Sequence, residues 1–211
     1  MISFNEDEYD LLKETFNLAM GQAAADLAVL LKSFVDMVVP DINIVKAEKV
    51  VEAIVGDASC WRDEPVTATR QTFYLGNIVD GEAIVAFDDQ TFDNVSRLLG
   101  FEDKIDRQYK IEIMLEMTNI MVSACLNGIS NQLFGKNMSF APPMVLSENN
   151  TYKKIIYGAF QRSQLRWDYT MLAKISFKLK NESFRSEMLL FLSEKAILAI
   201  HQSITKLLSD M

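Results

Sequence analysis

Cysteine and histidine are scarce in this sequence, which has two cysteines and one histidine among 211 residues. Cys60 and Cys125 stand alone, and they fit neither the ligand spacing of a metal site nor a disulfide framework. We interpret both as buried free thiols. No nucleophile motif lies near His201, so a surface or hydrogen-bonded histidine is expected there rather than a catalytic base.

Positive charge and long apolar runs are also scarce. The chain has 21 Lys and Arg against 29 Asp and Glu, which gives a formal net charge of -8 and argues against binding to nucleic acid or to an anionic membrane surface. No apolar run approaches the roughly 18 residues of a spanning helix. The acidic start, MISFNEDEYD, is unlike a secretory signal. We therefore expect a soluble, cytoplasmic protein.

Motifs for nucleotides, dinucleotides and zinc are absent as well, so the sequence predicts no cofactor or metal of its own. What it does contain is apolar residues at 49%, enough for one sizeable core or for two small ones that share a sheet. Hydrophobic periodicity and turn residues then divide the chain into two halves that run through a similar order of elements.

In the first half, the patterns predict a helix over 7–34, a strand over 36–45, a short helix over 48–54, strands over 66–75 and 81–87, and a helix over 88–100. Small residues in the first helix indicate close packing, and Pro40 is expected at the start of its strand or on a sheet edge. The second half predicts a helix over 106–134, a strand over 139–146, a polar stretch over 147–168, strands over 169–179 and 184–192, and a last helix with Ser193 as its N-cap.

One polar pattern occurs in both halves, 102 positions apart. The first copy is Asp10, Glu14, Asn17 and Pro40, and the second is Glu112, Glu116, Asn119 and Pro142. This internal repeat predicts an α+β fold of two duplicated α-β-β-β-α halves that share one mainly antiparallel sheet flanked by long helices. We expect a single domain over 1–211, made of repeats at about 1–104 and 105–211.

Positions i, i+4 and i+7 fall on one narrow face of a helix, so each copy predicts a polar stripe that faces solvent. The carboxylate of Glu can grip a cation there, and the amide of Asn can hold a water molecule. Ordinary helix surface is the alternative interpretation. Against it, no other Glu in the chain has Asn three residues later, and 22 residues separate Asn from Pro in both copies.

The pattern Asp/Ser-x3-Glu-x2-Asn-x22-Pro resembles the signature of the CheC/CheX/FliY family of bacterial response-regulator phosphatases, and two repeats in about this length resemble CheC. The first copy matches throughout. The second departs at Glu112, where the family usually has Asp or Ser. Flagellar switch proteins related to the family look similar in fold but lack the Glu–Asn pair.

The resemblance implies a protein aspartyl-phosphate phosphatase that acts on a CheY-like receiver domain carrying its own Mg2+. Glu14 or Glu116 pairs with a receiver lysine, and Asn17 or Asn119 positions the attacking water. Asp10, Pro40, Glu112 and Pro142 support these residues. The alternative hypothesis is a non-catalytic docking module of the same fold, which binds a receiver domain or a CheD-like partner.

Overall fold

The computed structural model describes residues 2–32, 34–56, 65–88, 106–162, 168–179 and 185–210. Cys60 and the helix predicted over 88–100 therefore lie outside the described residues, apart from Asp88. The elements of the first half are α1 (Glu6–Leu31), β1 (Val35–Lys46), a short 3-10 helix (Ala47–Lys49), α2 (Val50–Gly56), β2 (Pro65–Leu75) and β3 (Val79–Asp88). Those of the second half are α4 (Arg107–Phe134), β4 (Ser139–Phe140), β5 (Met144–Thr151), α5 (Tyr152–Arg162), β6 (Tyr169–Leu179), β7 (Arg185–Leu192) and α6 (Glu194–Ser209).

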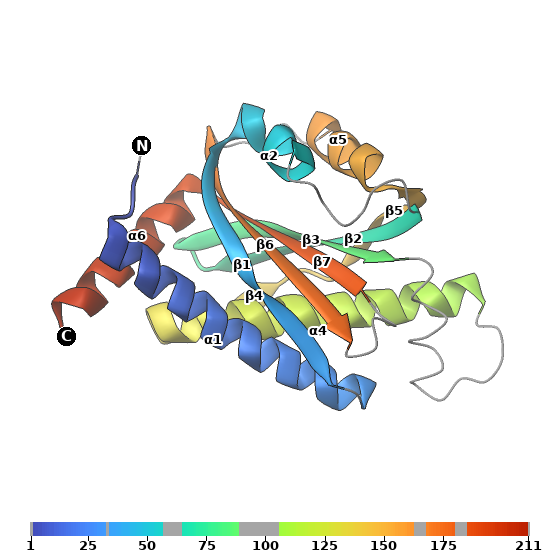
Figure 1. The fold of residues 1–211 in the computed structure, drawn as a ribbon, viewed down its shortest axis with the longest axis horizontal. Coiled ribbons are helices and arrows are strands. Elements are labelled where there is room, and N and C mark those ends of the chain that lie inside the picture. The colour runs from blue at the N-terminus through green and yellow to red at the C-terminus, as the bar shows by residue number, and fades with distance from the viewer. Residues whose placement is uncertain are drawn as a thin grey trace.

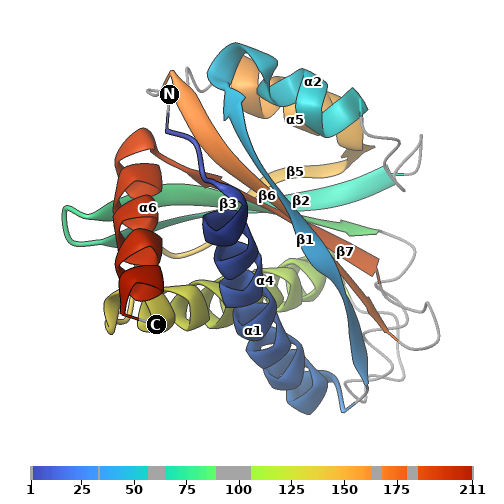
Figure 2. The ribbon, with the colours of Figure 1, turned by 60° about the vertical axis from the view of Figure 1, so that its left-hand side comes forward.

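The described strands form one seven-stranded sheet in the order β1-β6-β7-β3-β2-β4, and β5 also pairs with β2. Every pairing is antiparallel. Helices α1 and α4 cross on one side of the sheet, and α2 and α5 lie together on the other (Figures 1 and 2). These layers confirm the predicted α+β class with a mainly antiparallel sheet between helices.

The two halves of the chain exchange their first strands. β1 of the first half pairs with β6 of the second, whereas β4 and β5 of the second half pair with β2 of the first. Read inward from either edge, the sheet therefore presents corresponding strands: β1, β6 and β7 from one side, and β4 or β5, β2 and β3 from the other. This exchange is the reason the duplicated halves share a single sheet.

Each face of the sheet has its own hydrophobic core. Phe73, Val85 and Phe177 belong to the core beneath α1, α4 and α6, whereas Ala68 and Leu172 belong to the core beneath α2 and α5. The alternation follows from the two-residue period of a strand. The central strands β3 and β7 are buried on both faces, which explains their nearly continuous apolar sequences AIVAF and MLLFL.

Caps fix the ends of the two long helices. Asn5 and Glu8 form a capping box at the start of α1, and the Asp106 side chain accepts a 2.8 Å hydrogen bond from the Tyr109 N–H at the start of α4. Gly135 ends α4 in the left-handed region, at φ 63°. α4 has the length and hydropathy of a membrane span, but half of its most apolar window is buried inside this fold, as in a core helix.

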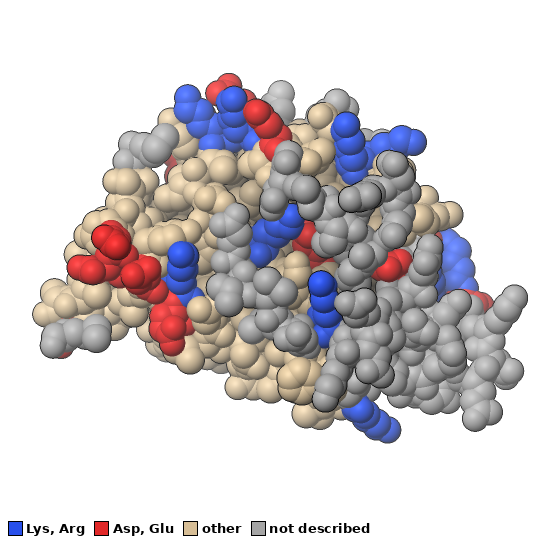
Figure 3. Space-filling view, in the orientation of Figure 1, with Lys and Arg blue, Asp and Glu red and all other residues tan. Residues whose placement is uncertain are grey.

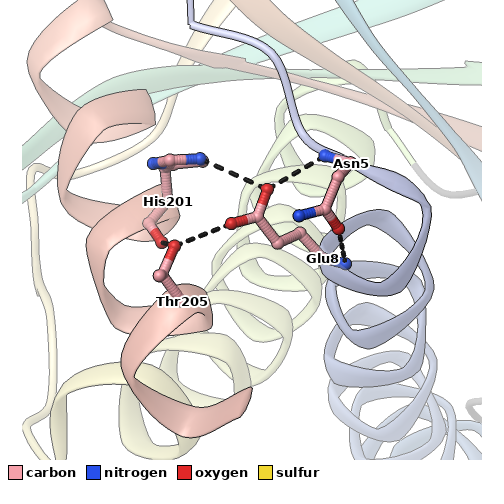
Figure 4. Close-up of polar contacts among 4 residues, drawn as sticks. All are labelled: Asn5, Glu8, His201 and Thr205. Carbon is pink, nitrogen blue, oxygen red and sulfur yellow. Dashed lines mark hydrogen bonds and ion pairs between the residues drawn. The ribbon is translucent and has the colours of Figure 1, made fainter. Parts of the chain in front are cut away.

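The last helix, α6, is tied to the first turn of α1 by a small polar cluster (Figure 4). The Glu8 carboxylate accepts hydrogen bonds from the Asn5 N–H at 2.9 Å and the Thr205 hydroxyl at 2.8 Å, and His201 Nε2 lies 3.3 Å away. The Asn5 N–H, then Thr205, lower the pKa of Glu8 below its ordinary value. His201 is thus a partnered histidine, and Ser193 caps α6 as expected, accepting from the Ala196 N–H at 3.2 Å.

One sequence prediction in the second half was wrong, and one helix was not predicted. The strand expected over 139–146 is interrupted, because residues 141–143 separate β4 from β5. The stretch described as polar, to which no element was assigned, contains α5, whose inward side chains Tyr152, Ile155 and Ile156 are buried in the core beneath α2 and α5. The Tyr152 hydroxyl also hydrogen-bonds the buried carboxylate of Glu187 on β7, which fastens α5 to the sheet.

Candidate functional site

The acidic positions of both predicted stripes are exposed on the long helices. Asp10 and Glu14 lie on α1, and Glu112 and Glu116 lie on α4. Glu112 accepts a 3.1 Å hydrogen bond from the side chain of Gln108, one turn earlier. Figure 3 shows acidic side chains gathered over the first half of α1. Carboxylates placed this way are available to a cationic side chain of a partner.

The two asparagines are less exposed than the stripe pattern predicts, because Asn17 and Asn119 are both half-buried. Three residues along a helix correspond to a rotation of about 300°, which is about 60° less than a full turn. Each Asn is therefore turned away from its Glu and toward the packed side of the helix. Their direct neighbours in the chain, Phe16 and Thr118, are fully buried. Each asparagine therefore stands at the boundary between the helix surface and the core.

Asn119 is held by a residue of the sheet. Its Oδ1 accepts a 2.9 Å hydrogen bond from Nε2 of Gln71 on β2, and the same Nε2 donates to the carbonyl oxygen of Ala141 at 3.0 Å. Ala141 precedes Pro142, the proline of the second copy. Gln71 thus links the asparagine and the proline segment of one repeat, although it comes from the other half of the chain.

Asn17 has a different environment. Its Oδ1 is buried and has no hydrogen-bond partner within the described part of the chain. β6 occupies the place in the sheet order that corresponds to β2. Its core residues on the side of α1 and α4 are all apolar: Met171, Ala173, Ile175 and Phe177. The amide of Asn17 is therefore not fixed in the way that the amide of Asn119 is.

The two prolines also occupy unlike positions. Pro40 lies within β1, an edge strand as expected, where the pairing register shifts between Val38 and Asp41. Pro142 is exposed in the break between β4 and β5. Proline lacks an N–H to donate to a sheet, so both positions avoid a lost ladder hydrogen bond.

The structure does not bring the two Glu–Asn pairs together into one site. α1 and α4 are in close contact where Gly128 meets Ala19. Gly128 follows Asn119 by nine residues, which is about 13 Å along a helix. Within the described residues, no three His, Cys, Asp or Glu side chains gather to hold a metal ion. Each helix thus presents its own carboxylate and amide.

Several solved structures resemble this chain over nearly all of their own length. FliY from Thermotoga maritima aligns with a TM-score of 0.65 at 17% identity, covering 97% of this chain and 99% of that one. The chain has the CheC-like fold. No family model and no curated protein matches the sequence itself.

The CheC-like fold is also seen in two further matches. The chemotaxis protein CheX from Vibrio vulnificus aligns with a TM-score of 0.57 at 11% identity, over 85% of this chain and 99% of that one. The middle domain of FliM from H. pylori aligns with a TM-score of 0.60 at 7% identity, over 95% and 99%. At these identities the likeness establishes the fold of this chain, and its activity has to be argued from its own residues.

Sequence reasoning missed Gln71. The motif pairs residues on a helix with a proline farther along, and it contains no position on β2. A signal was nevertheless present in VTATRQTFYL, where Thr69, Gln71 and Phe73 alternate on one face of the strand. Gln71 is 1% exposed, and a buried polar side chain at an inward strand position indicates a specific hydrogen-bond partner.

Proposed function

We propose that this protein accelerates hydrolysis of the aspartyl phosphate of a CheY-like receiver domain. The observation that carries the proposal is the repeated pair of an exposed glutamate and, three residues later, a half-buried asparagine, on both long helices of a CheC-like fold. Since the pair occurs on α1 and on α4, the proposal gives the protein two sites. It acts in the cytoplasm, where phosphorylated receivers are found.

The glutamate docks the receiver and the asparagine positions water. Glu14 or Glu116 pairs with a lysine of the receiver, which orients the phosphorylated aspartate toward the helix. Asn17 or Asn119 then holds a water molecule in line with the phosphorus. The water oxygen bonds to phosphorus as the bond from phosphorus to the aspartate oxygen breaks, and the products are inorganic phosphate and a free aspartate carboxylate.

Such a site needs little chemistry of its own. Phosphoryl transfer depends mainly on positioning and on electrostatic stabilisation, and the Mg2+ that supplies much of the latter belongs to the receiver. A helix surface with one carboxylate and one amide is therefore sufficient. Each asparagine is half-buried, so its amide can contact the phosphoryl group only when the receiver is docked against the helix.

A docking module is the second candidate, because the FliM middle domain has the same fold. In that case the protein binds a receiver, or a CheD-like protein, without accelerating loss of phosphate. The departure at Glu112 from the usual Asp or Ser favours a specialised partner of this kind. The two candidates differ in one measurable property, the rate of dephosphorylation at saturating protein.

The test is the release of phosphate from a receiver of the same organism, phosphorylated in the presence of Mg2+. It is measured with wild type, Asn17→Ala, Asn119→Ala and the double variant. We expect acceleration by wild type, and its loss in the double variant. Asn131→Ala is the matched control, because Asn131 is an exposed asparagine near the end of α4. Binding without acceleration by wild type would overturn the phosphatase and favour the docking module.

A further inference from the structure

Gln71 is buried between β2 and α4, and both hydrogens of its side-chain amide are used. One goes to Oδ1 of Asn119 at 2.9 Å and the other to the carbonyl oxygen of Ala141 at 3.0 Å. Both partners are acceptors. A reversed Gln71 amide would place its own oxygen against them, so only one orientation of this side chain is compatible with its surroundings.

The oxygen of the Gln71 amide, Oε1, is buried and has no hydrogen-bond partner within the described residues. A buried acceptor without a hydrogen bond is unfavourable for folding, and such groups in native proteins call for a reason. An apolar side chain at position 71 would avoid this cost. What it could not supply is the pair of donated hydrogen bonds that ties Asn119 to the segment before Pro142.

The orientation of Gln71 determines that of Asn119. Because Oδ1 of Asn119 accepts from Gln71, its Nδ2 is the amide atom that does not face Gln71. Among the residues that the structure describes, Asn17 has no such support, since its Oδ1 is unpaired there and the corresponding strand β6 carries apolar residues toward α1. The two sites are therefore similar in sequence and unequal in rigidity.

We propose that Gln71 is a positioning residue that fixes the amide of Asn119, and that the site on α4 is consequently the faster of the two. This rests on the proposed phosphatase function. Rates of this kind depend strongly on how well a water-holding group is kept in its productive orientation. The Asn119 amide is held in one orientation before the receiver arrives, whereas that of Asn17 has to be ordered during docking.

The kinetic test is made in the Asn17→Ala background, so that only the α4 site contributes. Gln71→Met keeps the approximate volume of the side chain and removes its donors. We expect kcat to fall about tenfold with KM unchanged, because the glutamate that docks the receiver is not altered. The single variant Asn17→Ala, in which only the α4 site is intact, should also have a higher kcat than Asn119→Ala, in which only the α1 site is intact. Equal kcat values for these two single variants overturn the ranking of the sites.

Thr69→Val is the matched control. Thr69 lies on the same strand and its hydroxyl is 2.6 Å from that of Thr118, the neighbour of Asn119, in the same interface. Its replacement removes a buried hydrogen bond between β2 and α4 without touching the Asn119 amide. A loss of kcat in Gln71→Met but not in Thr69→Val supports positioning. An equal loss in both indicates a general loosening of the interface and overturns it.

A second measurement does not depend on the phosphatase reaction. The side-chain amide signals of Asn119, identified by their absence in Asn119→Ala, are followed by 1H–15N NMR without any receiver. We expect Gln71→Met to shift both signals and to lower their order parameter, and Thr69→Val to leave them in place. Gln71→Leu, a second apolar replacement without donors or acceptors, should repeat the effect and serves if Gln71→Met does not fold.

The two measurements separate the two proposals. If no receiver is dephosphorylated by wild type but the Asn119 signals respond to Gln71→Met, the proposed function fails and the fixing of the amide stands. If wild type is active and neither the NMR signals nor kcat change in Gln71→Met or Gln71→Leu, the positioning role of Gln71 is wrong.

Discussion

Ala19 of α1 lies directly against Gly128 of α4. A Cβ atom placed on Gly128 would stand 2.8 Å from the Cβ of Ala19 and 2.9 Å from its Cα, closer than real Cβ atoms approach. The crossing of the two helices that carry the Glu–Asn pairs therefore requires glycine at position 128. The close packing predicted from the small residues of the first helix is found at this contact.

Gly128→Ala should destabilise the protein. Alanine favours a helix over glycine by about 1 kcal/mol, but here the added methyl meets backbone of the neighbouring helix, and relief requires α1 and α4 to separate. We expect a net loss of about 1–3 kcal/mol in the free energy of unfolding, measured by urea titration. Ala19→Gly, combined with Gly128→Ala, should recover part of that loss by restoring the space.

Gly21→Ala is the contrasting substitution. Gly21 lies in the interior of α1, it is exposed, and a Cβ there would meet nothing within 4 Å. We expect it to raise the free energy of unfolding by about 0.5–1 kcal/mol through helix propensity alone. If Gly128→Ala were as stabilising as Gly21→Ala, the close approach at Ala19 would be contradicted.

Removing the charge of the docking glutamates should raise KM for the receiver more than it lowers kcat. In the double variant Glu14→Gln, Glu116→Gln, we expect KM for the phosphorylated receiver to rise about tenfold, equivalent to about 1.4 kcal/mol, with kcat little changed. The reason is the lost ion pair with a receiver lysine. The measurement is steady-state phosphate release as a function of receiver concentration.

Glu48→Gln, Glu52→Gln is the control for net charge, because it removes two exposed carboxylates from the 3-10 helix and α2, away from α1 and α4. Long-range attraction between the acidic protein and a receiver would be reduced equally by either pair of substitutions, and it weakens as salt is added. A KM that rises equally in both double variants would show that the effect is nonspecific and that Glu14 and Glu116 do not dock the receiver.

Glu8 should contribute to stability in a pH-dependent way. The fold lowers the pKa of its carboxyl below the ordinary value of 4.5, chiefly through the Asn5 N–H and then through Thr205. A depressed folded-state pKa means that the contribution is present above the unfolded-state pKa and is lost as pH falls through the folded-state value. The stability difference between wild type and Glu8→Gln should therefore be present above about pH 4.5 and shrink below it.

Urea unfolding between about pH 6 and pH 3 measures this difference. Glu6→Gln is its control, since Glu6 is an exposed acid in the same helical turn. Thr205→Val, which removes one hydrogen bond to the Glu8 carboxylate, should move the transition to higher pH. If the difference in the free energy of unfolding between wild type and Glu8→Gln stayed the same down to pH 3, the Glu8 carboxylate would not stabilise the fold through its charge.

Much of the fold could be predicted because its signals are local. The start of α4 is marked by Asp106 as N-cap, its end by Gly135, and the start of α6 by Ser193. The two strands buried on both faces have continuous apolar sequences. The repeated pattern was visible because Glu, Asn and Pro recur at a constant separation of 102 positions, and the first position is acidic in both copies. The order of strands in the sheet is consistent with this repeat.

The prediction failed where a local signal was weak or misread. In α5, Tyr152, Ile155, Ile156 and Ala159 follow helical spacing, but polar neighbours and the absence of a clear cap hid the pattern. The strand expected over 139–146 is broken in the structure at residues 141–143, which include Pro142. That break is what lets Ala141 accept a hydrogen bond from Gln71.

The sequence by itself determined which residues stand on each helix, since a period of 3.6 places Glu14 beside Asn17 and Glu116 beside Asn119. Only the tertiary structure decided how the two asparagines differ. Gln71 lies 48 residues from Asn119 in the chain, and it reaches that side chain because the halves exchange strands and bring β2 under α4. A hydrogen bond between residues so distant depends on packing, which no local pattern records.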